Sequence, residues 1–145
     1  MSVMFLIGRI ALVAIFLVNG ILNLMDRAGA AALIQSKFAI PAGLSDAATS
    51  AQTATGMPPY ELLAIGVSAI EIICALLIIF NLLTRFAALV LFVYTAVVAY
   101  FLYDLFGFPV DQRTVILLHV ALAGGLLVLL AIGPWRPLVD EEYGA

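Results

Sequence analysis

Four long runs of apolar residues divide the chain. They cover residues 3–25, 61–80, 84–106 and 114–133. A helix of about 20 apolar residues crosses the hydrocarbon core of a bilayer, so each run predicts one spanning helix. The links around 81–85 and 107–113 are so short that consecutive spans must be antiparallel neighbours. The pattern predicts an all-α, four-helix membrane bundle forming a single domain over residues 1–145.

The first run has some features of a secretory signal peptide. It contains one basic residue, Arg9, and the small-residue stretch AGAAA follows it at 28–32. A signal core is usually 7–15 residues long, which is about half the length of this run. We therefore interpret residues 3–25 as a retained span.

The only long connection is 26–60, and its two halves differ in character. In the first half Ala31, Ile34 and Phe38 share one helical face, which predicts a short amphipathic helix at the membrane interface. Pro41 is expected to end this helix. The second half, GLSDAATSAQTATGMPP, is rich in Ala, Ser, Thr and Gly. We expect it to be a mobile loop.

Composition supports the membrane assignment and excludes several classes of protein. The chain is 66% hydrophobic and 10% charged, and its mean hydropathy is +1.22. Soluble domains carry about 45–50% apolar and 25% charged residues. A large soluble domain and a nucleic-acid partner are thereby excluded, and the bilayer is the expected surrounding. With one Cys and one His, no metal site is predicted from this chain's histidine unless carboxylates or another subunit contribute ligands.

The distribution of basic residues gives a weak indication of orientation. With the N-terminus in the cytoplasm, one side holds Arg9, Arg85 and Arg136, and the other holds Arg27, Lys37 and Arg113. The amino terminus and the shorter link favour cytoplasmic N- and C-termini. We expect a multi-pass protein of the cytoplasmic (inner) membrane.

Glu71 lies in the middle of the second run, with no basic residue within ten positions on either side. A carboxylate at this depth is costly if it faces lipid, so it should be buried. The depth of Arg9 differs from that of Glu71 by roughly 6–10 Å, which an extended Arg side chain can bridge. Three interpretations stay open: pairing with Arg9, a protonated acid bonded to a Ser or Tyr, and a role in ligand or proton chemistry. Arg9 has its own alternative, which is to reach the headgroups of the nearer leaflet.

Other polar residues also lie within the spans. Asn19 and Asn23 share a face of the first span with Arg9 and Phe16, where asparagines either join helices or bind a ligand. Tyr94 is deep enough to need a partner for its hydroxyl. His119 is either a packing residue or a proton-transfer group, and Cys74 is expected to be a small buried hydrophobe. The catalytic candidates are Glu71 and His119. The candidates for ligand binding or a polar interior are Arg9, Asn19, Asn23 and Tyr94.

Several short motifs together resemble the DoxX family. They are Gly8-Arg9 in the first span, Glu71 in the second, Leu83-Thr84-Arg85 in the following link, and Gly133-Pro134 with Arg136 after the last span. The family consists of small four-helix membrane proteins of bacteria and archaea. It is similar to the membrane subunit of thiosulfate:quinone oxidoreductase, and other members are linked to oxidative-stress and thiol-redox partners. The segment 45–60 is longer than the resemblance leads us to expect.

The resemblance implies a subunit of a quinone-linked membrane redox system. Quinone is then the expected small molecule, with Glu71, His119 and Tyr94 supplying protons or hydrogen bonds. One thiol and no haem or flavin motif mean that electrons must come from a bound cofactor or a partner protein. The alternatives are a non-catalytic scaffold or accessory subunit of a larger complex, and a small lipid- or ligand-binding membrane protein. Either a partner protein or a homo-oligomer is expected.

Overall fold

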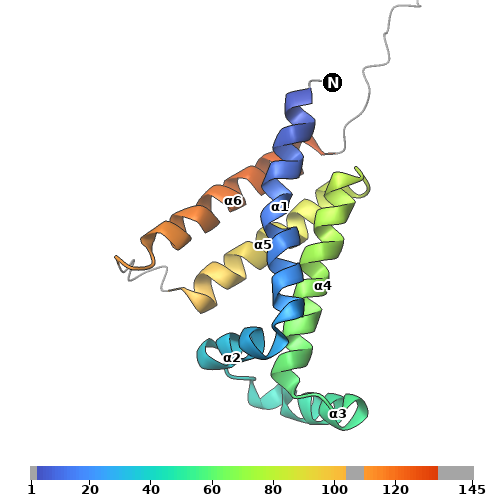
Figure 1. Ribbon diagram of the computed structural model, residues 1–145, viewed down its shortest axis with the longest axis vertical. Helices are drawn as coiled ribbons and strands as arrows, with labels where there is room; N and C mark the ends of the chain where they lie inside the picture. Colours follow the sequence, from blue (N-terminus) through green and yellow to red (C-terminus); the bar gives the residue numbers. More distant parts are fainter. Residues whose placement is uncertain (1–2, 104–109, 134–145) are drawn as a thin grey trace, which may run out of the picture.

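The computed structural model describes residues 3–103 and 110–133, and all regular structure within them is helical (Figure 1). The helices in chain order are α1 (Val3–Met25), α2 (Arg27–Lys37), the 3-10 helix η1 (Ala42–Leu44), α3 (Ser45–Thr55), α4 (Pro59–Ile79), α5 (Thr84–Leu102) and α6 (Arg113–Ile132). The predicted all-α fold class is confirmed.

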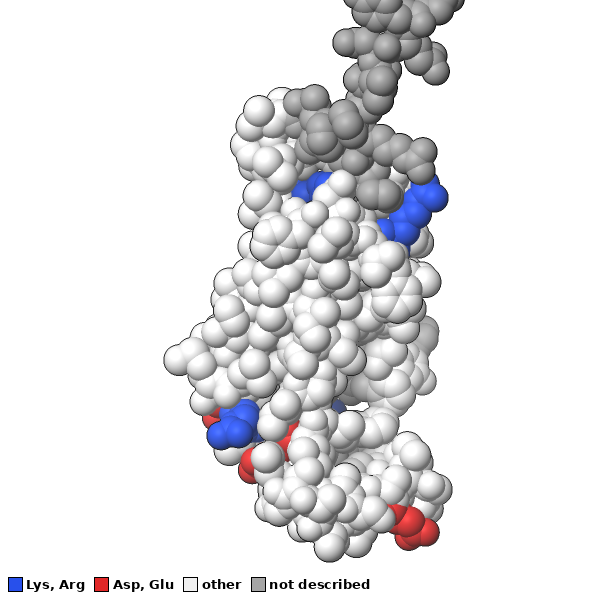
Figure 2. All heavy atoms as spheres, turned by 90° about the vertical axis from the view of Figure 1, so that its right-hand side faces the viewer, with Lys and Arg blue, Asp and Glu red and all other residues white. Residues whose placement is uncertain are grey.

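Four of these helices, α1, α4, α5 and α6, are long and apolar enough to cross a membrane. In Figure 2 the charged atoms gather toward the two ends of the visible face, and a broad uncharged band separates them. The predicted limits of three spans agree with the helices to within two residues. The third span was predicted too long, because Tyr103 already has extended dihedral angles, with φ −123° and ψ 143°. Positions 104–106 of that prediction lie outside the described residues.

The four spans form two closely packed pairs. α1 lies along α4, and α5 lies along α6 (Figure 1). The four-residue link 80–83 between α4 and α5 makes them antiparallel neighbours, as predicted. Two glycines bring helices together. A Cβ on Gly20 of α1 would lie 2.8 Å from Ile72 of α4, and one on Gly125 of α6 would lie 2.7 Å from Leu12 of α1.

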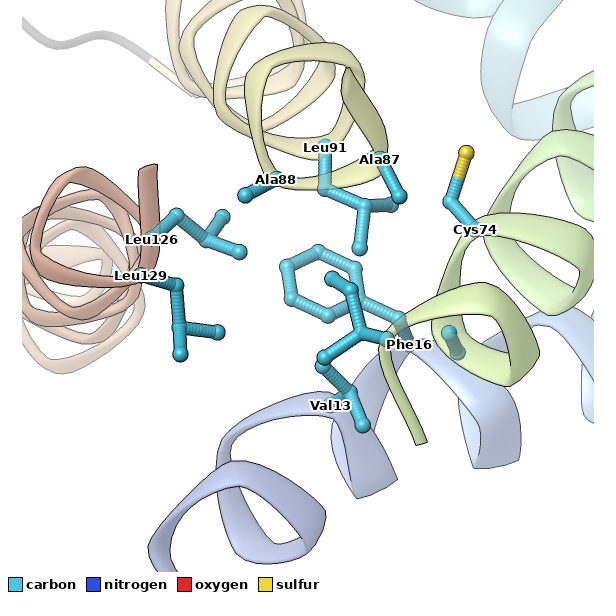
Figure 3. Close-up of a cluster of buried hydrophobic side chains, with 10 residues drawn as sticks. Val13, Phe16, Cys74, Ala87, Ala88, Leu91, Leu126 and Leu129 are labelled. Atoms are coloured by element: carbon cyan, nitrogen blue, oxygen red, sulfur yellow. The ribbon is translucent and has the colours of Figure 1, made fainter. Parts of the chain in front are cut away.

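The apolar core lies where the two pairs meet. Figure 3 shows Val13 and Phe16 of α1 facing Leu126 and Leu129 of α6, with Leu91 of α5 beside them. Cys74 is 6% exposed and belongs to the same cluster. Its assignment as a small buried hydrophobe is confirmed. The core therefore fixes the rotation of each span, and with it the direction of every polar side chain on those spans.

The long connection is helical in both halves. α2 is the predicted amphipathic helix, with Ala31 buried and both Ile34 and Phe38 half-buried. It ends at Lys37, earlier than Pro41, and Phe38 is already extended, with φ −129° and ψ 116°. The Phe38 ring meets that of Phe101 on α5 edge to face, with centroids 5.5 Å apart.

The prediction of a mobile loop in the second half was wrong, since residues 45–55 form α3. Thr49, Ser50, Thr53 and Thr55 each donate a side-chain hydrogen bond to the backbone carbonyl four residues earlier. These hydroxyls therefore do not compete with the helix for its amide groups. Gly56 closes the helix in the left-handed conformation, with φ 71°.

Candidate functional site

Glu71 lies near the middle of α4 and is only 1% exposed. Its carboxyl accepts hydrogen bonds from the Asn19 side-chain amide of α1, at 2.9 Å to Oε1 and 3.2 Å to Oε2. The Tyr94 side chain of α5 forms a further hydrogen bond with the same carboxyl. The predicted burial of Glu71 is confirmed, and three spanning helices supply the groups of this polar centre.

The packing around Glu71 explains how the three side chains meet. Gly20 has no side chain, so α1 approaches α4 closely there, and the Gly20 backbone lies beside Ser68 and Glu71. Asn19, the neighbouring residue, therefore comes within reach of the carboxyl. On the other side, the Tyr94 ring packs against Phe16 at 6.5 Å between centroids and at an interplanar angle of 63°. This contact holds the tyrosine hydroxyl toward the carboxyl.

Arg9 does not pair with Glu71, so that interpretation was wrong. The Arg9 guanidinium, 3% exposed, donates to the backbone carbonyl of Ile78, to Asn81 Oδ1 at 2.8 Å and to Thr84 Oγ1 at 3.4 Å. Ile78 lies seven residues from Glu71, or roughly 10 Å along the helix axis. The Arg9 side chain extends toward the end of the bundle that carries the N-terminus, away from the carboxyl.

The end of α4 offers Arg9 better partners than a lone carboxylate. The last carbonyls of a helix have no amide partner within the helix and carry partial negative charge, which a cation stabilises. The turn after α4 adds Asn81, whose φ of 62° is in the left-handed region. Arg9 thus ties α1 to the α4–α5 turn. Its remaining Nε–H has no acceptor among the described residues, and the Phe5 ring lies 5.7 Å from the guanidinium carbon.

His119 lies apart from Glu71. Its half-buried ring places Nδ1 2.7 Å from the Val115 carbonyl oxygen, so Nδ1 carries the proton and donates. The ring also packs on Tyr103 at 5.1 Å between centroids. Asn23 is half-buried one turn beyond Asn19. Within the described part of the chain, neither residue forms a hydrogen bond with the Glu71 carboxyl. The structure therefore unites Glu71, Asn19 and Tyr94, and leaves His119 and Asn23 outside their contacts.

Three residues of the polar interior were missed by the sequence patterns. Gly20 sets the close approach of α1 and α4, and Asn81 and Thr84 bind Arg9. Two sequence signals could have indicated them. Gly20 directly follows Asn19 within a span, and Asn81 and Thr84 are hydrogen-bonding residues in or next to the short link between two spans. A second contact at the same end places the Arg85 side chain against Gly133. The motifs Gly8-Arg9 and Leu83-Thr84-Arg85 and the residue Gly133 thus meet at one end of the bundle.

Comparison with known proteins gives one match. The model of the DoxX family matches residues 4–104, which include α1, α4, α5 and the long connection between α1 and α4. α6 lies beyond the matched range. No curated protein and no solved structure matches the chain.

Proposed function

Since the chain belongs to the DoxX family, we propose that it is a membrane subunit of a quinone-linked redox system and works with a partner protein. The observation that carries the proposal is the environment of Glu71. A carboxyl lies in the middle of a spanning helix, 1% exposed, and receives hydrogen bonds from two uncharged side chains. No described cation neutralises it.

This environment suits proton exchange with a lipid-soluble molecule. A carboxyl group that is neutralised by no fixed cation can change its protonation state without breaking an ion pair. Asn19 and Tyr94 hold the group in one orientation, and proton transfer requires such positioning. Burial at this depth keeps the group away from bulk water. Glu71 is accordingly the proton-exchanging residue, and Asn19 and Tyr94 are its positioning residues.

The residues around Glu71 also fit a quinone ring as substrate. The half-buried Tyr94 ring lies beside the carboxyl, and the Asn19 amide and the Tyr94 hydroxyl are suited to oxygen atoms on a ring. A quinone supplies redox chemistry, and this chain supplies the hydrogen bonds and a site for a proton. The electrons come from a partner, because the single Cys74 cannot form a disulfide or a cluster within the chain.

We place the protein in the cytoplasmic membrane with both termini in the cytoplasm. The support is the distribution of basic residues along the sequence. In this orientation α2 and α3 lie on the outer side, at the opposite end of the bundle from the N-terminus (Figure 1). The partner would then contact either α2 and α3 or the exposed faces of the spans.

A non-catalytic scaffold is the second candidate, and the Arg9 contacts favour it. Arg9 binds a helix end and a turn, which fixes the packing of α1, α4 and α5. A buried polar network of this kind specifies a single arrangement of helices. If the Glu71 contacts serve the same purpose, the protein holds a complex together without binding a quinone.

The discriminating experiment is quinone extraction from the protein purified in a mild detergent. The proposal predicts that quinone co-purifies with the unmodified chain. In Glu71→Gln the amount of co-purified quinone should fall at least about tenfold, a loss that corresponds to about 1.4 kcal/mol of binding free energy. Glu61→Gln is the matched control, because Glu61 lies in the first turn of the same helix, about 15 Å away.

Folding of each variant is checked by circular dichroism and gel filtration. Equal quinone content in the unmodified chain and both variants contradicts the role of Glu71. A chain that carries no quinone and binds none when it is added supports the scaffold.

A further inference from the structure

Asn19 has hydrogen-bonding groups that the described chain leaves unused. Its amide nitrogen donates to both oxygens of the Glu71 carboxyl, at 2.9 Å and 3.2 Å. The two N–H bonds of an amide nitrogen diverge widely, whereas the two oxygens of a carboxyl lie close together, so one N–H serves both contacts. The second N–H and the Oδ1 atom have no partner among the described residues. Asn19 therefore keeps one free donor and one free acceptor.

These free groups lie on an exposed side of α1, at the depth of Glu71. Asn19 is exposed, and its hydrogen bond holds it level with the Glu71 carboxyl. Glu61, in the first turn of α4, is roughly 15 Å from Glu71 along the helix axis, or about half the thickness of the hydrocarbon core. Lipid chains at this depth offer neither a donor nor an acceptor, so unpaired amide groups there are costly. The Asn19 amide thus requires a protein partner.

A carboxamide is complementary to a second carboxamide. When two such groups meet, the N–H of each donates to the carbonyl oxygen of the other. This pairing uses the Asn19 groups alone, so it does not depend on the protonation state of Glu71. A second copy of the chain supplies the matching amide. Copies share one orientation in the membrane, and a two-fold axis along the membrane normal keeps each residue level with its equivalent.

The exposed face of α1 around Asn19 suits contact with another helix. Ile15 and Leu22 are 36% and 57% exposed, and they lie four residues before and three residues after Asn19, on the same side of α1. Nearer the N-terminus this side carries Gly8, where a Cβ would meet nothing within 4 Å, and the exposed Ala11. Small residues let spanning helices approach closely. Positions 8, 15 and 22 repeat every seven residues, as in helices that pack side by side.

From the self-complementary amide and this exposed face we infer that α1 forms a homodimer interface, in which Asn19 pairs with Asn19 of the partner subunit. The pair joins two polar centres, since each Asn19 also binds a Glu71 carboxyl. The second subunit thereby completes the hydrogen bonding of each centre. A single polar residue in an apolar interface also fixes the register and the number of helices. The inference goes beyond the proposed function, because the pairing requires no quinone.

The first test is disulfide cross-linking of the full chain in lipid vesicles, in a Cys74→Ala background that removes the native thiol. Ile15→Cys and Leu22→Cys place a thiol on the proposed interface. Ile21→Cys is the matched control, because Ile21 is 45% exposed at nearly the same depth as Leu22 but lies on the other side of the helix from Asn19.

A disulfide needs Cα atoms within about 7 Å of each other. Oxidation should therefore give covalent dimers of the chains with a thiol at position 15 or 22, and leave the chain with a thiol at position 21 monomeric. Cross-linking of all three variants to the same extent, or of the control alone, overturns the inference, and so does the absence of cross-linking in all three.

The second test measures self-association without engineered cysteines. Copies labelled at the N-terminus with a donor or an acceptor dye are placed in phosphatidylcholine vesicles, and energy transfer is followed over a series of protein-to-lipid ratios. The unmodified chain is expected to dimerise. Asn19→Leu, which keeps the size of the side chain, should raise the dissociation constant about tenfold through the loss of the interhelical hydrogen bonds.

Tyr94→Phe is the matched control for this measurement. It also removes a hydrogen bond to Glu71 but leaves the surface of α1 unchanged, so its dissociation constant should equal that of the unmodified chain. A monomeric unmodified chain overturns the inference, as does Asn19→Leu that associates normally. Equal weakening by both variants overturns it too, because the effect would then arise within the Glu71 centre. The vesicles contain no quinone, so failure of the proposed function leaves these outcomes unchanged.

Discussion

Asn19 of α1 and Glu71 of α4 are joined by a hydrogen bond at 2.9 Å, beside the close approach of the two helices at Gly20. The close approach and the hydrogen bond depend on each other. Gly20 has no side chain to keep α4 away, so the short Asn19 side chain reaches the carboxyl. A larger residue at position 20 would widen the gap between the helices and separate donor from acceptor.

Gly20→Ala is therefore expected to destabilise the bundle. The new methyl group would lie 2.8 Å from Ile72 Cγ1 and 3.0 Å from the Ser68 carbonyl oxygen, and the backbone oxygen cannot move aside. Overpacking of this kind costs about 1–3 kcal/mol. The free energy of unfolding, measured by titration with sodium dodecyl sulfate in mixed micelles, should fall by this amount. Quinone content should fall with it if the proposed function holds.

Gly66→Ala is the matched control on α4. Nothing lies within 4 Å of a Cβ at that position, so the gain in helix propensity, up to about 1 kcal/mol, should dominate. If both variants are equally stable, the close approach at Gly20 does not constrain the bundle.

Tyr94→Phe tests the second donor to Glu71. The change removes the hydroxyl and keeps the ring that packs on Phe16. One hydrogen bond within a membrane bundle contributes about 0.5–2 kcal/mol, and the free energy of unfolding should fall by that amount. The loss should become smaller in a Glu71→Leu background, because the hydroxyl has then lost its acceptor. Tyr103→Phe keeps the ring contact with His119 and serves as the control. An identical loss in both backgrounds would show that Tyr94 does not act through Glu71.

The spans could be predicted from sequence because the bilayer imposes their length and hydropathy. The burial of Glu71 followed from the same physics, since a charge at mid-membrane depth must avoid lipid. The partners of Glu71 did not follow. The depths of the two residues placed Arg9 within reach of Glu71, but the direction of an Arg side chain depends on helix rotation and on competing acceptors. The carbonyl of Ile78 at the end of α4, which no residue pattern reveals as an acceptor, binds the guanidinium instead.

The second half of the long connection shows a different limit of sequence patterns. Ser and Thr favour turns when their hydroxyls compete for backbone groups. In α3 these hydroxyls instead bond to carbonyls one turn earlier, as Thr49 does to Ser45. A composition of this kind is compatible with either a helix or a loop, so the residue pattern alone does not distinguish them.

Gly56→Ala should weaken α3 without unfolding the spans. Gly56 has φ 71°, where an alanine Cβ costs about 1–2 kcal/mol. Amide hydrogen exchange in residues 45–55 should accelerate about tenfold, while exchange in α4 stays unchanged. Gly43→Ala is the control, because Gly43 has open space around it and no positive φ. Unchanged exchange in α3 would mean that the left-handed conformation of Gly56 does not contribute to the stability of α3.

A double-mutant cycle between Arg9 and Glu71 tests their separation directly. The two residues share no partner, so Arg9→Met and Glu71→Leu should be additive, with a coupling energy below about 0.5 kcal/mol. A second cycle between Arg9 and Asn81, with Asn81→Gly to keep the left-handed backbone, should give a coupling of about 0.5–3 kcal/mol. Both cycles are measured by unfolding in mixed micelles. A coupling of about 1 kcal/mol or more between Arg9 and Glu71 would show an ion pair in the membrane, where the structure has two separate polar centres.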